Sequence, residues 1–265
     1  MTSITASAPA SRSRNDDLRA IPAVLRSEWI KVSSLRMSTV ILALTVVVNG
    51  LASWATATFV TDEVLTAADV YIFPAVLTSV LAAIASILVF TSEAQHGTLA
   101  ATLTARPARW VITVGKTVTA VGLGLVLGTV GMAVGFAGAL AGGVELGDTA
   151  SMPSTTGWTL LFTSLAALIG LGVGMTVRHS AGAVSGFLVW WFVAENLIRA
   201  FAPPRSVHFL PFEAGYRILE VGSDFDTPEI LAASLTRPQY ALVFGGYALI
   251  ALLLGTTLLY RRDTN

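Results

Sequence analysis

The sequence predicts an all-α integral membrane protein with six transmembrane helices, an N-terminal interfacial helix, a short helix between the second and third spans, and a two-helix cap outside the membrane. Hydrophobic residues make up 54% of the 265 residues. Charged residues make up only 12%, against about 25% in soluble domains. The mean hydropathy is +0.73, and the charges gather between long uncharged runs, each near the ~20 residues that cross a bilayer core.

The N-terminal region divides into two parts. Residues 1–15 are rich in Ser, Ala, Thr and Arg without apolar periodicity, which predicts disorder. Residues 16–37 repeat apolar side chains at intervals of three and four, with basic residues between them. A basic amphipathic helix that carries Trp29 at headgroup level is typical of the membrane interface. The alternative is a soluble helix packed on another subunit.

Six apolar segments predict the spans of a transmembrane domain over residues 38–265. The third segment is longer than a bilayer requires, which predicts tilt or projection beyond the membrane. An even number of spans puts both termini on one side. The expected ranges are 39–60, 70–91, 111–141, 158–177, 181–201 and 240–260.

The positive charges predict the orientation. Twelve of the 16 Lys and Arg residues fall in the N-terminal segment, the second-to-third and fourth-to-fifth connections, and the C-terminus. The other four fall on the opposite side. The positive-inside rule therefore predicts that both termini are cytoplasmic in a multi-pass protein of the plasma membrane.

The connection before the last span is too long for a turn. We expect one helix over residues 212–221, followed by a short helix that begins near Pro228 and runs through Leu235. Asp226 and Thr227 supply an N-cap immediately before that proline. The two helices would cover the bundle on the outer side. A disordered loop is the alternative.

The third span carries glycines at intervals of three and four. This spacing keeps them on one face of a helix, where the lack of side chains lets a neighbouring backbone approach closely. We predict tight helix packing along this seam; a surface that slides during transport is the alternative. A smaller cluster of three glycines near the end of the fourth span predicts the same packing. The seam consists of Gly124, Gly128, Gly131, Gly135, Gly138 and Gly142.

Four polar side chains within the spans are candidates for a transport pathway. Asn49 in the first span predicts an interhelical hydrogen bond or, as the alternative, a ligand. Glu195, Asn196 and Arg199 lie near the outer end of the fifth span. Glu195 and Arg199 are four residues apart, so we expect them to pair on one helix face, or Arg199 to reach the interface from the outer end of the span. A role at the extracellular exit stays open, because ionisable groups in a span are costly and often functional.

The sequence predicts no catalytic, cofactor or metal site. Without cysteine, it has neither disulfides nor thiolate chemistry. Gly115–Thr117 resembles the end of a phosphate-binding loop, but Trp110 stands where that loop needs its first glycine. His96, His179 and His208 lack the spacing of a metal site. We therefore do not expect an enzyme.

The stretch from 92 to 116 is the one long polar-to-basic segment between two spans on the predicted cytoplasmic side. Glu93 lies at the end of the second span, and Gly97–Thr98 is expected to break its helix. Residues 99–104 can form a short amphipathic helix that Pro107 ends. Arg109 then anchors the next span at the interface. We expect a short, rigid helix across the membrane surface; a basic interfacial loop is the alternative.

This stretch resembles the corresponding loop of the ABC-2 type transporter permeases. Ser27 to Lys31, with Glu28 and Trp29, is similar to the N-terminal elbow helix of that family, particularly in actinobacterial members. The six spans and the outer cap extend the resemblance over nearly the whole chain. Ala100–Ala101 departs from the family pattern, which has bulkier acidic and leucine residues there. The loop positions that match are Glu93, Gly97, Thr98, Leu99, Leu103, Pro107, Arg109, Gly115 and Lys116.

The resemblance implies a dimeric exporter permease with two separate ATPase subunits on its cytoplasmic face. ATP and magnesium would be bound by those partners only. The second permease would be a copy of this chain or a related one, and the substrate a drug, lipid-like molecule or peptide. The elbow helix and the loop from Glu93 to Arg109 would form the docking surface. Two other classes stay open, an ion-coupled secondary carrier and a non-transporting membrane scaffold or sensor.

Overall fold

The computed structural model describes residues 14–60, 64–98, 108–220 and 226–262, and every element within these ranges is a helix. The predicted disordered N-terminus lies almost entirely outside them. In chain order the elements are α1 (Arg14–Ser34), α2 (Arg36–Phe59), α3 (Ala67–Val70), α4 (Ala75–Gln95), α6 (Arg109–Ala141), α7 (Met152–Val177), α8 (Ser180–Val189), the π-helical turn η1 (Trp190–Ala194), α9 (Glu195–Phe201), α10 (Pro204–Val207), α11 (Pro211–Ile218), α12 (Pro228–Ala232) and α13 (Arg237–Arg262).

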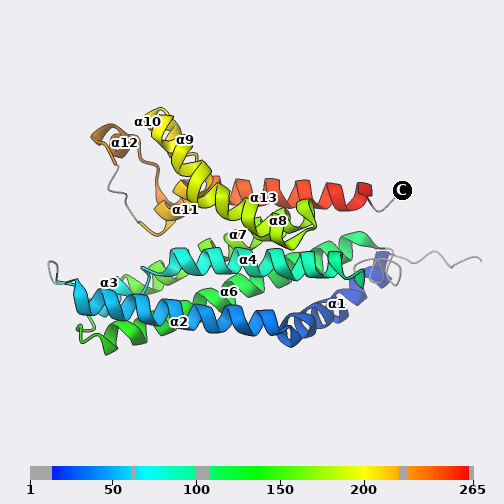
Figure 1. The fold of residues 1–265 in the computed structure, drawn as a ribbon, viewed down its shortest axis with the longest axis horizontal. Helices are drawn as coiled ribbons and strands as arrows, with labels where there is room; N and C mark the ends of the chain where they lie inside the picture. Colours follow the sequence, from blue (N-terminus) through cyan, green and yellow to red (C-terminus); the bar gives the residue numbers. More distant parts are fainter. Residues whose placement is uncertain (1–13, 61–63, 99–107, 221–225, 263–265) are drawn as a thin grey trace, which may run out of the picture.

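Within the described ranges, six helical stretches are long and apolar enough to cross a membrane. They are α2, α3 with α4, α6, α7, the continuous stretch from α8 to α9, and α13. The long helices run along the long axis of the molecule (Figure 1). The protein is therefore an all-helical, multi-pass membrane protein, as the sequence predicts. The 33 residues of α6 extend ~50 Å, well beyond a hydrocarbon core of ~30 Å.

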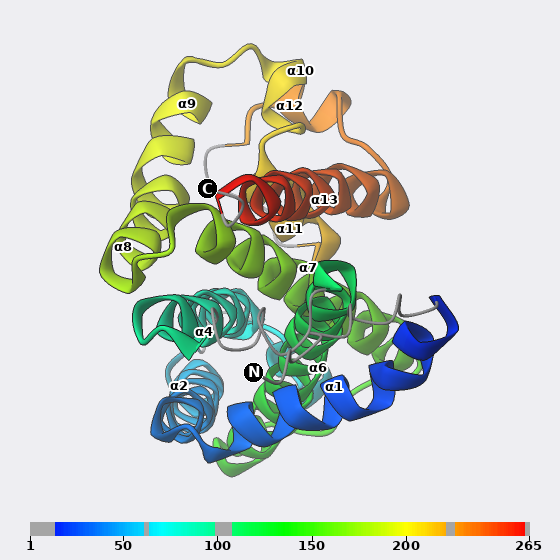
Figure 2. The same cartoon turned by 90° about the vertical axis from the view of Figure 1, so that its right-hand side faces the viewer.

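The two ends of the bundle differ. At the end where α4 stops and α6 starts, which we call the basal end, α1 crosses in front of α6 and reaches the start of α2 (Figure 2). At the opposite end, the cap end, α10, α11 and α12 precede α13 (Figure 1). The predicted cap helices are present as α11 and α12, which end three residues earlier than expected. The structure adds α10, which the sequence analysis did not predict.

The second span departs from the prediction of one helix over residues 70–91. The chain forms α3, turns over residues 71–74, and only then starts α4, which continues to Gln95. Pro74 stands at the N-cap of α4 and lacks the amide that a continuous helix would require. A reciprocal capping box between Thr66 and Asp69 starts α3. The proline and the capping box therefore divide the second span into two helices, although its apolar run predicts a single helix.

The central helix is α7, which packs against α4, α6 and α13. Its buried Phe162 joins an aromatic group near the cap end. In that group the rings of Trp191 and Phe212 stack with their centroids 3.8 Å apart, and Phe244 packs against both Phe162 and Phe212. Because Phe212 belongs to α11, this cluster holds the cap against the spans.

The glycine seam of α6 packs against three neighbours in turn. A Cβ atom on Gly124 would lie 2.6 Å from the Cα atom of Ser164 in α7. A Cβ atom on Gly131 would lie 2.9 Å from the Thr78 hydroxyl of α4, and one on Gly138 would overlap the Gly50 carbonyl of α2. The predicted helix packing is present, and it joins α6 to α7, α4 and α2.

Candidate functional site

The sequence-predicted residues Glu28, Glu93 and Lys116 come together at the basal end. Glu28 belongs to α1, Glu93 to the last turns of α4 and Lys116 to the second turn of α6. Lys31, one turn after Glu28 on α1, completes the group. We call these four residues the basal tetrad. Its members come from three helices, so the tetrad joins α1 to the two spans that flank the loop.

The four charges of the basal tetrad alternate in a closed ring. The Lys116 ammonium lies 3.1 Å from Glu28 Oε2 and 2.8 Å from Glu93 Oε2. The Lys31 ammonium lies 2.6 Å from Glu28 Oε1 and 3.4 Å from Glu93 Oε1. Each carboxylate therefore binds both ammonium groups, one through each oxygen, and the group as a whole has no net charge.

Most of the basal tetrad is removed from solvent. Lys116 and Glu28 are each 3% exposed, whereas the Lys31 side chain is 35% exposed. The Lys116 ammonium also lies over the Phe90 ring, 5.6 Å from its centroid, a cation–π contact. Because a buried charge is costly unless it is paired, the position of α1 depends on this ring of contacts.

The pKa values in α1 reflect this balance. Burial alone would raise the pKa of Glu28, but the neighbouring ammonium groups of Lys116 and Lys31 outweigh it, so this pKa lies below its usual value. Burial alone would lower the pKa of Lys31, but Glu28 and Glu93 outweigh it and raise this pKa. Both shifts favour the charged forms of Glu28 and Lys31.

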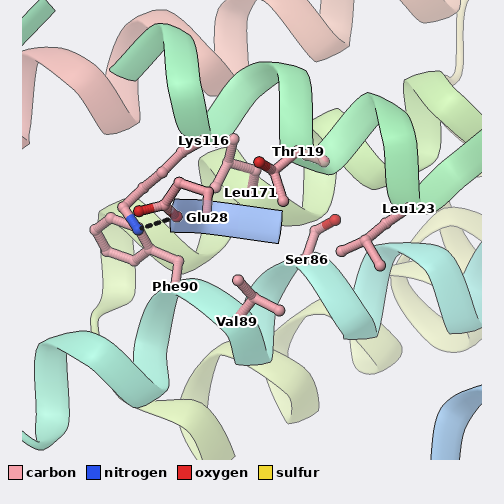
Figure 3. A pocket seen from close by; sticks show the side chains of 9 residues that line it. Glu28, Ser86, Val89, Phe90, Lys116, Thr119, Leu123 and Leu171 are labelled. Carbon is pink, nitrogen blue, oxygen red and sulfur yellow. Dashed lines mark hydrogen bonds and ion pairs between the residues drawn. The ribbon is translucent and has the colours of Figure 1, made fainter. Parts of the chain in front are cut away.

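A small cavity of about 10 Å³ adjoins the buried half of the basal tetrad. Glu28, Lys116, Thr119 and Ser86 of α4 are among the residues that line it (Figure 3). This volume matches a single water molecule. The cavity is too small for a substrate, so we read the tetrad as a structural joint and not as a binding pocket.

The predicted loop leaves the bundle directly from the basal tetrad. After α4, Gly97 takes a left-handed conformation with φ of +74°, which ends the helix as the sequence predicts. The Thr98 hydroxyl donates to the Glu93 carbonyl at 3.3 Å. Arg109 opens α6 and donates to the Tyr260 carbonyl of α13 at 2.8 Å. Leu99, Leu103 and Pro107 lie outside the described residues.

On α1, Trp29 is 47% exposed, a position compatible with the interfacial role expected from the sequence. A Cβ atom on Gly122 would lie 3.5 Å from its ring, so the indole rests against α6 while its other face is open.

Close to the tetrad, the Cβ position of Gly115 lies 2.6 Å from Val24. The glycine at 115 therefore lets α1 approach the helix that carries Lys116.

Asn49 forms the interhelical hydrogen bond that the sequence predicts. Its Oδ1 atom accepts from the Thr78 hydroxyl of α4 at 2.9 Å, and its amide donates to the Thr45 carbonyl at 2.8 Å. The side chain is 1% exposed. These contacts explain Asn49 through helix packing between α2 and α4.

Near the cap end, five side chains form a second charged group, which we call the cap cluster. The prediction that Glu195 pairs with Arg199 is wrong. In the described structure, the Glu195 carboxylate instead accepts from the backbone amides of Phe212 and Glu213 at 3.1 and 2.6 Å. The first amides of a helix have no acceptors within that helix. The Glu195 carboxylate supplies two such acceptors and thereby caps the N-terminus of α11. The cap cluster consists of Glu195, Arg199, Glu213, Arg217 and Asp226.

The arginines of the cap cluster share two acidic partners. Arg199 binds Glu213 at 3.0 Å and Asp226 at 2.8 Å, and Arg217 binds the same residues at 2.9 and 2.6 Å. Burial alone would lower the pKa of Arg217, but Asp226 and Glu213 outweigh it and raise this pKa. Asn196 donates to the Phe192 carbonyl of its own helix at 3.1 Å. The cluster fixes α9 against α11.

Comparison with known proteins adds no further assignment. No protein family matches this chain, and no curated protein matches it. Among the described side chains, no group of three His, Asp or Glu residues is placed to hold a metal ion. The functional interpretation therefore rests on the basal tetrad, the cap cluster and the sequence pattern of the loop.

Proposed function

We propose that this protein is the membrane subunit of an ATP-driven exporter. The observation that carries the proposal is the basal tetrad, which ties α1 to the ends of α4 and α6 at the point where the loop between them leaves the bundle. The resemblance of this loop and of α1 to ABC-2 type permeases supports the same conclusion. ATP and magnesium would be bound by a separate ATPase subunit, and the chain itself performs no chemistry.

The basal tetrad offers a route for mechanical coupling. A force on the loop acts on α4 through Gly97 and on α6 through Arg109. Because Glu93 and Lys116 are ion-paired to α1, the two helices cannot move apart without separating buried charges. A partner that closes on ATP would therefore move α1, α4 and α6 together. Packed interfaces of this kind shift between discrete arrangements more readily than they deform.

The proposed transporter contains two copies of the ATPase and a second permease, identical or related to this chain. Its substrate is hydrophobic or amphipathic, in keeping with the apolar spans. An ion-coupled carrier has less support, because it needs buried carboxylates near mid-membrane. Among the described residues, the buried carboxylates are Glu28, Glu93, Glu195 and Glu213, and all are held in contacts at the basal end or with the cap helices.

The proposed orientation places the basal end in the cytoplasm and is open to a direct test. The native chain has no cysteine, so single cysteines at Thr98 and Glu229 can be labelled without background. We expect a membrane-impermeant maleimide to label Glu229→Cys in intact cells and Thr98→Cys only after permeabilisation. The reverse pattern contradicts the orientation and with it the access of a cytoplasmic ATPase to the loop.

Purification of the tagged protein from its native membranes in mild detergent tests the function. We expect a soluble ATPase to co-purify, and Gly97→Trp to lower its recovery because the bulky side chain alters the start of the loop. Gly157→Trp is the control, since a Cβ atom there meets nothing within 4 Å and Gly157 lies near the cap end. Absence of an ATPase from a preparation that retains the permease contradicts the proposal.

A further inference from the structure

A buried histidine joins three helices at the cap end. His208 is the residue that ends α10, and it is 0% exposed. Its Nε2 atom lies 2.8 Å from the Ile230 carbonyl of α12, and its Nδ1 atom lies 2.7 Å from the Tyr240 hydroxyl of α13. Helices α10 and α12 lie side by side at this end of the molecule (Figure 1). The imidazole therefore connects two cap helices with the last span.

The partners of this imidazole determine its tautomer. The Ile230 carbonyl can only accept a hydrogen bond, so Nε2 of His208 carries a hydrogen atom and donates it. In a neutral imidazole the other nitrogen is then an acceptor, so the Tyr240 hydroxyl donates to Nδ1. The Tyr240 oxygen in turn accepts from the Leu235 amide at 3.1 Å. Neutral His208 thus gives every donor in this chain of hydrogen bonds an acceptor.

Protonation of His208 breaks this chain of hydrogen bonds. Both nitrogens of an imidazolium are donors, so Nδ1 would direct a hydrogen atom at the Tyr240 oxygen. The hydroxyl hydrogen of Tyr240 would then lose its acceptor. Because Tyr240 is only 3% exposed, bulk water does not replace the lost hydrogen bond. The new positive charge would also be buried, which is costly unless a partner compensates it.

The surroundings of His208 offer no such partner. Among the described side chains, no Asp or Glu forms an ion pair with it; Glu220, which follows α11, binds Arg237, and the acidic residues of the cap cluster bind its arginines. Glu229 of α12 is exposed. Apart from the cap cluster and Glu220, the titratable and charged residues on the neighbouring elements are Arg205 on α10, Tyr216 on α11, Glu229 on α12, and Arg237, Tyr240 and Tyr247 on the first turns of α13.

We propose that His208 is a pH-sensitive switch, which holds α12 against α10 and α13 when it is neutral and releases α12 when it is protonated. Histidine is the side chain that ordinarily changes charge between about pH 5 and pH 8, and ionisation of a buried histidine can separate the elements that it joins. Helix α12 has only five residues, too few to be stable without tertiary contacts. The proposed orientation places the cap end outside the cell, so the switch would respond to external acid.

The test is hydrogen exchange of the purified full-length protein in detergent at about pH 7.5 and about pH 5.5, with exchange times scaled for the intrinsic effect of pH on amides. The reporters are the amides of α12 and the Leu235 amide, which donates to Tyr240. In the wild type we expect their protection to fall by at least about tenfold at the lower pH, as for the loss of one buried hydrogen bond. The central helix α7 is the internal reference and should keep its protection.

Three variants assign the response to this histidine. His208→Gln removes the titratable ring and keeps a donor and an acceptor, so protection of α12 should be equal at the two pH values. The matched control is the double variant His96→Gln, His179→Gln. It removes the other two of the three histidines in the chain, both of which are exposed near the basal end, and it should respond as the wild type does.

Tyr240→Phe gives an independent test of the hydrogen-bond chain and keeps the test decisive where His208→Gln does not fold. Without the hydroxyl group, protonation of His208 no longer costs a hydrogen bond to Tyr240. The pH response of α12 should therefore be smaller than in the wild type.

Equal protection of α12 at the two pH values in the wild type would overturn the proposal. A full pH response in His208→Gln would also overturn it, because another group would then be the sensor. So would loss of the response in the double control variant, or a response in Tyr240→Phe as large as in the wild type. The experiment contains neither an ATPase nor a substrate, so its outcome is independent of the proposed exporter function.

Discussion

Replacing Lys116 by methionine isolates the contribution of the basal tetrad. Methionine keeps an unbranched side chain and removes the ammonium group that lies 3.1 Å from Glu28 and 2.8 Å from Glu93. The two carboxylates are 3% and 9% exposed. They would then share Lys31 alone, and the tetrad would carry one excess negative charge. Removal of one partner from a buried ion pair costs about 3–5 kcal/mol, so we expect a loss of this size in the free energy of unfolding.

Two further variants separate charge from packing. Lys31→Met makes the same substitution at a side chain that is 35% exposed, and solvent screening limits its cost to about 1 kcal/mol. The double variant Glu93→Gln, Lys116→Met restores charge balance, since Glu28 and Lys31 still pair. We expect it to be less destabilised than the sum of its single variants by about 1–3 kcal/mol.

The assay is denaturant unfolding of the purified protein in detergent micelles, followed by circular dichroism. A Lys116→Met variant within about 0.5 kcal/mol of the wild type would refute the reasoning, because changes of that size are usual at ordinary surface sites. Strict additivity in the double variant would also refute it, since the two residues would then not be coupled.

Glu28, Gly124 and Glu195 each make a contact that a single substitution can test. Because the pKa of Glu28 is lowered from 4.5, its contribution to stability is present above about pH 4.5 and is lost as the pH falls through the lowered value. Glu28→Gln should therefore flatten the acid limb of a curve of unfolding free energy against pH. An unchanged acid limb would contradict this. Gly124→Leu should lower the yield of monodisperse protein in size-exclusion chromatography, because its Cβ atom would lie 2.6 Å from a backbone atom of α7, whereas Gly157→Leu should behave as the wild type. Glu195→Ala leaves two buried amides of α11 without an acceptor, at about 1–3 kcal/mol each, so hydrogen exchange over residues 211–218 should accelerate about tenfold or more, and unchanged exchange would show that the carboxylate does not hold this helix.

The spans and their packing faces could be predicted from the sequence because both are local patterns. An apolar run of about 20 residues defines a span whatever its neighbours are. The glycine seam likewise follows from spacing within α6, although the sequence does not say that Gly124 faces α7 and Gly138 faces α2. The sequence analysis did not predict the break between α3 and α4 because the apolar run continues through it. Pro74 within that run is a local signal for the break.

The contacts of the charged residues could not be derived from local pattern. Lys116 is separated from Glu28 by 88 residues and from Glu93 by 23, and helical periodicity does not specify a partner on another helix. The family resemblance selected Glu28, Glu93 and Lys116 without indicating that they meet. For Glu195 the local rule was misleading. It favoured the residue four positions away, whereas the amides at the start of α11, 17 and 18 residues along the chain, offer the buried carboxylate two hydrogen bonds.

The most direct test of the central claim, that a partner ATPase acts on the loop held by the basal tetrad, is site-specific photo-crosslinking in living cells. A photoreactive amino acid at Thr98, which is exposed beside the tetrad, should capture a soluble ATPase identified by mass spectrometry. The same residue at Glu229, in the cap, should not, and Lys116→Met should lower the yield at Thr98. Capture of no ATPase from Thr98, or equal capture from both positions, would contradict the account.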